Sequence, residues 1–161
     1  HGEISRLIRN LPGPSLPDLA GLGLVAALRR LVEDEVGAGF DQVEWEITPG
    51  SESADEELTQ LEEEVLYYAA REVMRNAARH GRVEGEAARP LGLKIAVSAA
   101  GKGIEVVIED DGAGFVGAEM NHLTSKQGLP LHSTMLAVIG GEMKIESEVG
   151  RFTRVRLILN K

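Results

Sequence analysis

Three polar side chains in the middle of the chain stand four residues apart: Glu72, Asn76 and His80. On a helix this spacing keeps all three on one ridge. A carboxylate, an amide oxygen and an imidazole on one ridge can serve a divalent cation, a water molecule and a phosphate group. The amide oxygen of Asn76 suits Mg²⁺ because it adds a ligand without adding charge beside a polyphosphate. The solvated face of an ordinary amphipathic helix has the same spacing, so both interpretations stay open.

A glycine-rich turn, Asp110-Asp111-Gly112-Ala113-Gly114, forms a second group directly after an apolar run. An aspartate at the end of a buried strand can accept a hydrogen bond from the amino group of a purine. Gly112 and Gly114 would let a ligand ring approach the backbone with no side chain in the way. A plain tight turn uses the same residue types, so the turn by itself is equally compatible with a structural role.

A third group, Lys126-Gln127-Gly128-Leu129, lies at the expected start of a helix. Free backbone N–H groups and the helix dipole at such a start are suited to binding an anion. The sequence contains neither a Walker-type phosphate loop nor the dinucleotide-binding glycine fingerprint. A single glycine before a helix is a weak signal when it is taken alone.

The spacing of apolar and turn-forming residues predicts the elements that must position these groups. Asp18 is expected to cap the second helix, and residues 49–55 are expected to form a polar loop. Hairpin strands separated by whole helices predict an α+β fold, a two-layer sandwich whose mixed, mostly antiparallel sheet is covered on one face by helices. The expected helices are 3–11, 18–36, 55–80 and 129–139, and the expected strands are 42–47, 91–98, 104–109, 142–148 and 152–159.

Composition narrows the class of protein further. The 161 residues include 26 acidic and 17 basic side chains, which give a net charge of −9, so nucleic acid is not expected as a main partner. The absence of cysteine excludes disulfides, thiol catalysis and thiolate zinc sites. The longest apolar stretch, residues 20–28, is far shorter than the roughly 20 residues that span a bilayer. We therefore expect a cytoplasmic location, and the sequence leaves open whether the parent protein is membrane-anchored.

The order and spacing of the three groups resemble the Bergerat-type (GHKL) ATPase superfamily, which includes gyrase B, Hsp90, MutL and histidine kinases. Residues 72–80 are similar to the asparagine box of sensor histidine kinases, and residues 110–114 to their first glycine box. Gly128-Leu129 resembles the second glycine box, and residues 140–153 resemble the closing strands. Residues 1–35 resemble the subfamily that partners response regulators with helix-turn-helix outputs. In that subfamily, residues 1–17 would be the end of a dimerisation helix and a Pro-rich linker, and residues 18–161 the ATP-binding catalytic domain.

The resemblance implies the ATP-binding kinase domain of a two-component sensor histidine kinase. Such a domain transfers the γ-phosphate of Mg-ATP to a histidine on a dimerisation domain outside this chain, and a response regulator is the further signalling partner. Asn76 would bind Mg²⁺, Glu72 would polarise a metal-bound water or the acceptor, and Asp110 would read the adenine amino group. The residues implied in nucleotide binding are Asn76, Arg79, His80, Asp110, Gly112, Gly114, Lys126, Gly128, Leu129 and Thr153.

Two other classes remain open at this point. One is another Bergerat-fold ATPase or an anti-sigma type serine kinase, and the other is a degenerate, non-catalytic nucleotide-binding module. The chain departs from the kinase pattern at Asp111, where asparagine is common, at Pro130, and at Phe152, where glycine is usual. Asp111 would add a negative charge near the triphosphate. The parent is expected to be a homodimer, and this chain alone a monomer, because residues 3–11 offer only about two helical turns for association.

Overall fold

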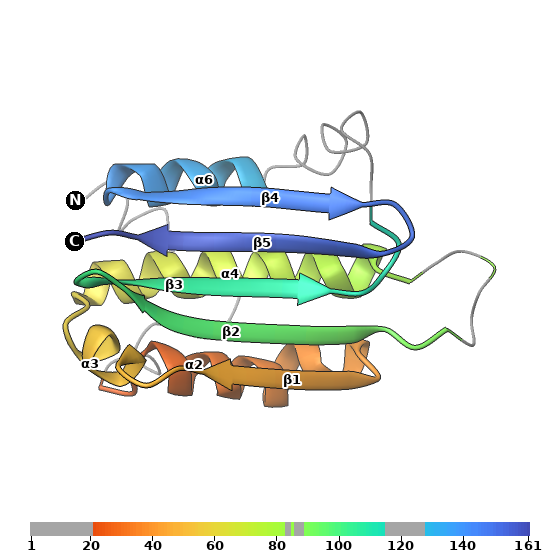
Figure 1. Cartoon of the computed structure of the whole chain (residues 1–161), viewed down its shortest axis with the longest axis horizontal. Helices are drawn as coiled ribbons and strands as arrows, with labels where there is room; N and C mark the ends of the chain where they lie inside the picture. The colour runs from red at the N-terminus through yellow and green to blue at the C-terminus, as the bar shows by residue number, and fades with distance from the viewer. Residues whose placement is uncertain (1–20, 83–84, 86–88, 115–127) are drawn as a thin grey trace.

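In the part of the chain that the structure describes, five strands form one sheet in the order β1-β2-β3-β5-β4, and the long helices lie against one of its faces (Figure 1). The computed structural model describes residues 21–82, 85, 89–114 and 128–161. β1 runs parallel to β2, and every other neighbouring pair is antiparallel. The predicted α+β fold with a mixed sheet is therefore confirmed. The elements are α2 (Leu24–Leu31), β1 (Gln42–Ile47), α3 (Ser51–Glu56), α4 (Gln60–His80), β2 (Gly92–Ala100), β3 (Gly103–Asp110), α6 (Gly128–Val138), β4 (Gly141–Glu148) and β5 (Phe152–Leu159).

The two faces of the sheet differ in chemistry because successive strand residues point to opposite sides. The face toward the helices is apolar and contributes fully buried residues such as Ile95, Val106 and Leu157 to the core. The opposite face carries a row of alternating charge across all five strands. In that row Arg154 pairs with Glu109 at 3.0 Å and with Glu146 at 3.3 Å. The row is Glu44, Lys94, Glu109, Arg154 and Glu146.

α4 is the central helix of the covered face, and it starts later than predicted. The sequence predicts one helix over 55–80, whereas the structure has the short helix α3 followed by α4 from Gln60. Thr59 separates the two helices because its backbone is extended. It is the N-cap of α4, where it forms a capping box with Glu62. The predicted polar loop over 49–55 is therefore wrong, since most of it belongs to α3.

The start of α2 also differs from the prediction, which placed it at Asp18. The helix begins at Leu24, after Gly23 with a φ of 85°, and Asp18 lies outside the described residues. The carboxylate of Asp55 accepts hydrogen bonds from the Leu24 N–H at 2.8 Å and the Val25 N–H at 3.0 Å. A side chain distant in sequence thus satisfies the free N–H groups that an N-cap residue normally binds.

The far end of α2 continues through a π-turn over Val32–Val36 and a 3₁₀ turn over Gly37–Gly39. This path brings Glu35 to Arg71 of α4, with 2.7 Å between Oε1 and Nη2. Leu24, Leu28, Leu31 and Val32 of this segment are buried in the core. Of the helices that the structure describes, none has both the length and the apolar character to cross a membrane.

Candidate functional site

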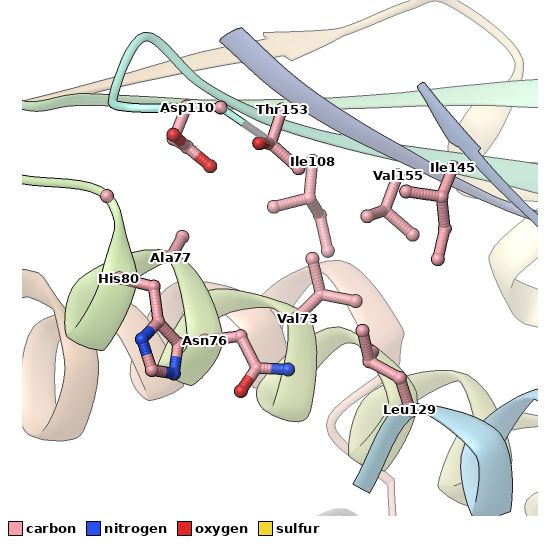
Figure 2. Close-up of a pocket in the computed structure, with 12 residues that line it drawn as sticks. Val73, Asn76, Ala77, His80, Ile108, Asp110, Leu129, Ile145, Thr153 and Val155 are labelled. Carbon is pink, nitrogen blue, oxygen red and sulfur yellow. The ribbon is translucent and has the colours of Figure 1, made fainter. Parts of the chain in front are cut away.

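A pocket lies between the C-terminal half of α4 and the sheet, where β3 ends and β5 begins (Figure 2). Its polar side chains are Asn76 and His80 on the helix and Asp110 and Thr153 on the sheet. Apolar residues and glycines form the rest of its wall. A planar apolar ligand with polar groups at its edge would match this lining. The other lining residues are Val73, Ala77, Gly81, Ile108, Gly114, Leu129, Ile145 and Val155.

Helical geometry decides which residues of α4 reach this pocket. Val73, Asn76, Ala77 and His80 follow the i, i+3, i+4, i+7 pattern of one helix face, and all four line the pocket. Glu72 and Arg79 each precede a lining residue by one position, which rotates them by about 100° around the helix.

The predicted single ridge is therefore only partly realised at the pocket. Asn76 and His80 line it, whereas neither Glu72 nor Arg79 is among its lining residues. Glu72 is half-buried and Arg79 is exposed on the neighbouring flank of α4. Residues four apart drift by about 40° per step, and this drift is enough to place Glu72 and His80 in different surroundings.

Asp110 is the most deeply buried polar group of the pocket, with 5% of its surface exposed. Its Oδ1 accepts a hydrogen bond from the Gly112 N–H at 3.0 Å, which orients the carboxyl group. Burial raises the pKa of Asp110 to about 6, and the neighbouring charges of Asp111 and Glu109 add to this effect, while the Gly112 hydrogen bond opposes it. The pocket thus holds a carboxylate whose ionised form is poorly solvated.

The Asp111 side chain does not line the pocket, although its charge contributes to the raised pKa of Asp110. Successive residues at the end of β3 point to opposite sides, so Asp110 faces the helices and Asp111 faces away. The Asp111 Oδ1 accepts a hydrogen bond from the Gly92 N–H at 2.7 Å. Phe152, the other departure at this end of the sheet, lies beneath the guanidinium of Arg154, 4.8 Å from its ring centre, on the charged face.

The glycines of the turn meet protein backbone rather than open space. A Cβ at Gly112 would overlap the Gly81 carbonyl, and one at Gly114, where φ is 62°, would overlap the Glu148 carbonyl. Between them, the Ala113 N–H donates to the Gly81 oxygen at 2.6 Å. Gly112 does not line the pocket, so at this position the need for glycine comes from packing against the end of α4, and not from ligand approach. Gly114 does line it.

The third predicted group is described only in part. Lys126 lies outside the described residues. Gly128 is the first residue of α6, and Leu129 lines the pocket. Within the described ranges, no cluster of three or more His, Asp or Glu side chains is placed to hold a metal ion. A Mg²⁺ ion bound through the Asn76 amide oxygen would take its other oxygen ligands from water and from a bound phosphate group, as Mg²⁺ commonly does in proteins.

The sequence predictions missed part of the site. Ile108, Ile145 and Val155 form its apolar wall, and the alternation of inward residues along the strands was the available signal. Ser147, which contacts Thr153 from the next strand, was also missed, because nothing local distinguishes it from an ordinary strand serine.

Comparison with known proteins places this fold among histidine kinase domains. The chain is similar to the Erythrobacter litoralis EL346 blue-light activated histidine kinase, with a TM-score of 0.67 and 17% identity over 96% of this chain and 45% of that one. It is also similar to the separate histidine kinase domain of the same protein, with a TM-score of 0.65, 16% identity, and coverage of 96% of this chain and 74% of that one. This chain thus spans under half the length of the first of these structures. No family model and no curated protein sequence matches the chain. At this level of identity the likeness establishes a histidine kinase-like fold.

Proposed function

We propose that this chain is the ATP-binding catalytic domain of a two-component sensor histidine kinase of the Bergerat-type superfamily. In this proposal it transfers the γ-phosphate of Mg-ATP to a histidine on a dimerisation domain, and a response regulator with a helix-turn-helix output receives the phosphate next. The observation that carries the proposal is the pocket in which a buried Asp110 faces the Asn76 side of α4 across apolar walls. The histidine kinase-like fold supports it independently.

Adenine is the part of the nucleotide that fits the inner end of this pocket. Ile108 and Val155 on the sheet and Val73 and Ala77 on α4 offer apolar surface to the two faces of a purine. Within the described residues, the Gly112 N–H donates to Asp110 Oδ1, and the remaining lone pairs of the carboxylate would accept a hydrogen bond from the adenine amino group. The free energy of that bond repays part of the desolvation cost of the carboxylate.

The triphosphate would extend along α4 toward Asn76 and His80. Asn76 would bind Mg²⁺, which supplies charge neutralisation for phosphoryl transfer when it is bound. His80, Arg79 and Lys126 are the proposed phosphate contacts. Because Glu72 lies on the flank of α4 and not in the pocket lining, its proposed role is to polarise an acceptor histidine that approaches from that flank.

Calorimetric titration of the chain with Mg-ATP tests the nucleotide assignment. We expect saturable binding by the wild-type chain, and a roughly 10- to 150-fold weaker affinity in Asp110→Asn, the range for one hydrogen bond to a charged group. Asp111→Asn is the matched control, because it makes the same substitution at the next residue, whose side chain lies on the opposite side of the sheet. Equal affinities of Asp110→Asn and the wild-type chain for ATP would contradict the assignment.

Phosphotransfer needs a separate experiment. The chain is mixed with labelled Mg-ATP and a separately produced dimerisation domain of the parent kinase, and acid-labile phosphohistidine is measured. We expect phosphohistidine on the dimerisation domain and its loss in Asn76→Ala, because the metal would lose its protein ligand. Intact ATP binding without any phosphohistidine would instead indicate a non-catalytic nucleotide-binding module.

A further inference from the structure

Asp110 and Thr153 both line the pocket, and a third side chain, Ser147, contacts Thr153 from outside the lining. In the register of the sheet Asp110 of β3 lies opposite Thr153 of β5, and Thr153 lies opposite Ser147 of β4. Figure 2 shows Asp110 and Thr153 on the sheet side of the pocket, facing α4. Ser147 is not part of the pocket lining, so a bound ligand would meet Thr153 and not Ser147.

The hydrogen bonds of these hydroxyl groups determine where each proton lies. The Ser147 hydroxyl donates to the Phe152 carbonyl oxygen at 2.9 Å, and a carbonyl can only accept. Ser147 has a single hydroxyl proton, so the 3.0 Å contact between its Oγ and the Thr153 Oγ1 must use the proton of Thr153. Thr153 therefore donates to Ser147 and presents lone pairs to its remaining surroundings.

We infer that Ser147 is a specificity-determining positioning residue. By engaging the hydroxyl proton of Thr153, it leaves Asp110 and Thr153 to form an edge of the pocket that can only accept hydrogen bonds. Such an edge selects a base that presents an amino group to it. The inference rests on the proposed nucleotide-binding function. An ionised Asp110 and a Thr153 whose proton is engaged both offer only lone pairs. An amino group supplies two N–H donors to such an edge, whereas a carbonyl oxygen in its place meets two acceptors and forms no hydrogen bond.

Without the Ser147 hydroxyl, Thr153 regains the freedom to donate. Its hydroxyl group could then rotate to donate to a carbonyl oxygen or to accept from an amino group, and the edge would no longer be acceptor-only. A general loosening of the β4–β5 hairpin would weaken the binding of every nucleotide to a similar degree. The ratio of two affinities therefore separates the specific role of Ser147 from a merely structural one.

The experiment measures the affinity of the chain for Mg-ATP and for Mg-inosine triphosphate, in which a carbonyl replaces the 6-amino group. The wild-type chain should prefer ATP, and Ser147→Ala should reduce that preference by about two- to tenfold, the factor that one ordinary hydrogen bond carries. Ser147→Thr keeps a hydroxyl and should restore the wild-type ratio. Ser98→Ala, on the opposite face of β2, controls for the loss of a strand hydroxyl.

A double-mutant cycle tests whether Ser147 acts through Thr153. In a Thr153→Val background, Ser147→Ala should not change the ratio further, because no hydroxyl proton remains to be directed. The inference is overturned if Ser147→Ala keeps the wild-type ratio, if it shifts the ratio equally in both backgrounds, or if the wild-type chain binds the two nucleotides equally. If the wild-type chain binds neither nucleotide, both the proposed function and this inference fail. If it binds ATP but gives one of the three outcomes above, only this inference fails.

Discussion

Replacing Asp110 by asparagine should stabilise the nucleotide-free protein while it weakens nucleotide binding. A tenfold change in proton affinity corresponds to about 1.4 kcal/mol, so a rise in the pKa from 3.8 to about 6 means that ionised Asp110 costs the folded state about 3 kcal/mol. Asparagine carries no charge, and its side-chain oxygen can still accept the hydrogen bond from Gly112. We therefore expect a gain of about 2–3 kcal/mol in unfolding free energy at pH 7.5, or roughly 5–10 °C in melting temperature.

The gain should depend on pH in a defined direction. The pKa of Asp110 is higher in the folded state than in the unfolded state, so protonation favours folding. The penalty is complete above pH 6, declines between about pH 6 and 4, and is absent below that window. The advantage of Asp110→Asn over the wild-type chain should shrink over the same window.

The comparison between variant and wild type must be made at each pH, because another buried group acts in the opposite sense. Burial, and then the charge of Arg71, lowers the pKa of His132 to about 4. Its neutral form therefore favours folding, and the wild-type chain loses that contribution as pH falls from 6.5 to 4. In the wild-type profile alone, the effects of His132 and Asp110 largely offset each other.

Urea denaturation of both proteins at pH 7.5, 5.5 and 4.5 is the assay, and Asp111→Asn controls for the loss of one negative charge. The reasoning is refuted if Asp110→Asn is less stable than the wild-type chain at pH 7.5, or if their difference is the same at all three pH values. Saturating Mg-ATP provides a second readout. It should raise the melting temperature of the wild-type chain far more than that of the variant, because only a ligand that binds the folded state stabilises it.

Three further predictions concern the elements that hold the site. Gly112→Ala should cost more unfolding free energy than Gly101→Ala, about 3 against about 1 kcal/mol in urea denaturation, because only the former drives a Cβ into a backbone carbonyl; equal costs would contradict this. Asp55→Ala should cost about 1–2 kcal/mol and speed amide exchange in the first turn of α2, and unchanged exchange would show that the cap is not needed. Glu35→Gln should cost about 1–3 kcal/mol, because the largely buried Arg71 loses the negative charge that it contacts at 2.7 Å. Arg71→Met should recover part of that loss in the Glu35→Gln background, and no recovery would argue against the pairing.

Regular local patterns were sufficient to predict most elements. The strands were predicted within about two residues because their inward and outward residues alternate, and this pattern depends only on the backbone of each strand. The errors fell at the two helix starts. At α4 the capping box of Thr59 interrupted an apolar stripe that continues across it, and at α2 the cap came from Asp55, about 30 residues away.

The sequence by itself determined the α+β fold, because helical and strand periodicities are properties of the local backbone, and it supplied the residue types of the proposed nucleotide pocket. Only the tertiary structure decided which of those residues meet. The orientation in which α4 packs on the sheet places Asn76 at the pocket and Glu72 on the neighbouring flank of the helix. The alternation of side chains at the end of β3 places Asp110 and Asp111 on opposite sides of the sheet. The contact between the Ser147 and Thr153 hydroxyl groups likewise depends on the register of β4 and β5. Such contacts depend on how separate elements pack, and no spacing along the chain encodes that packing directly.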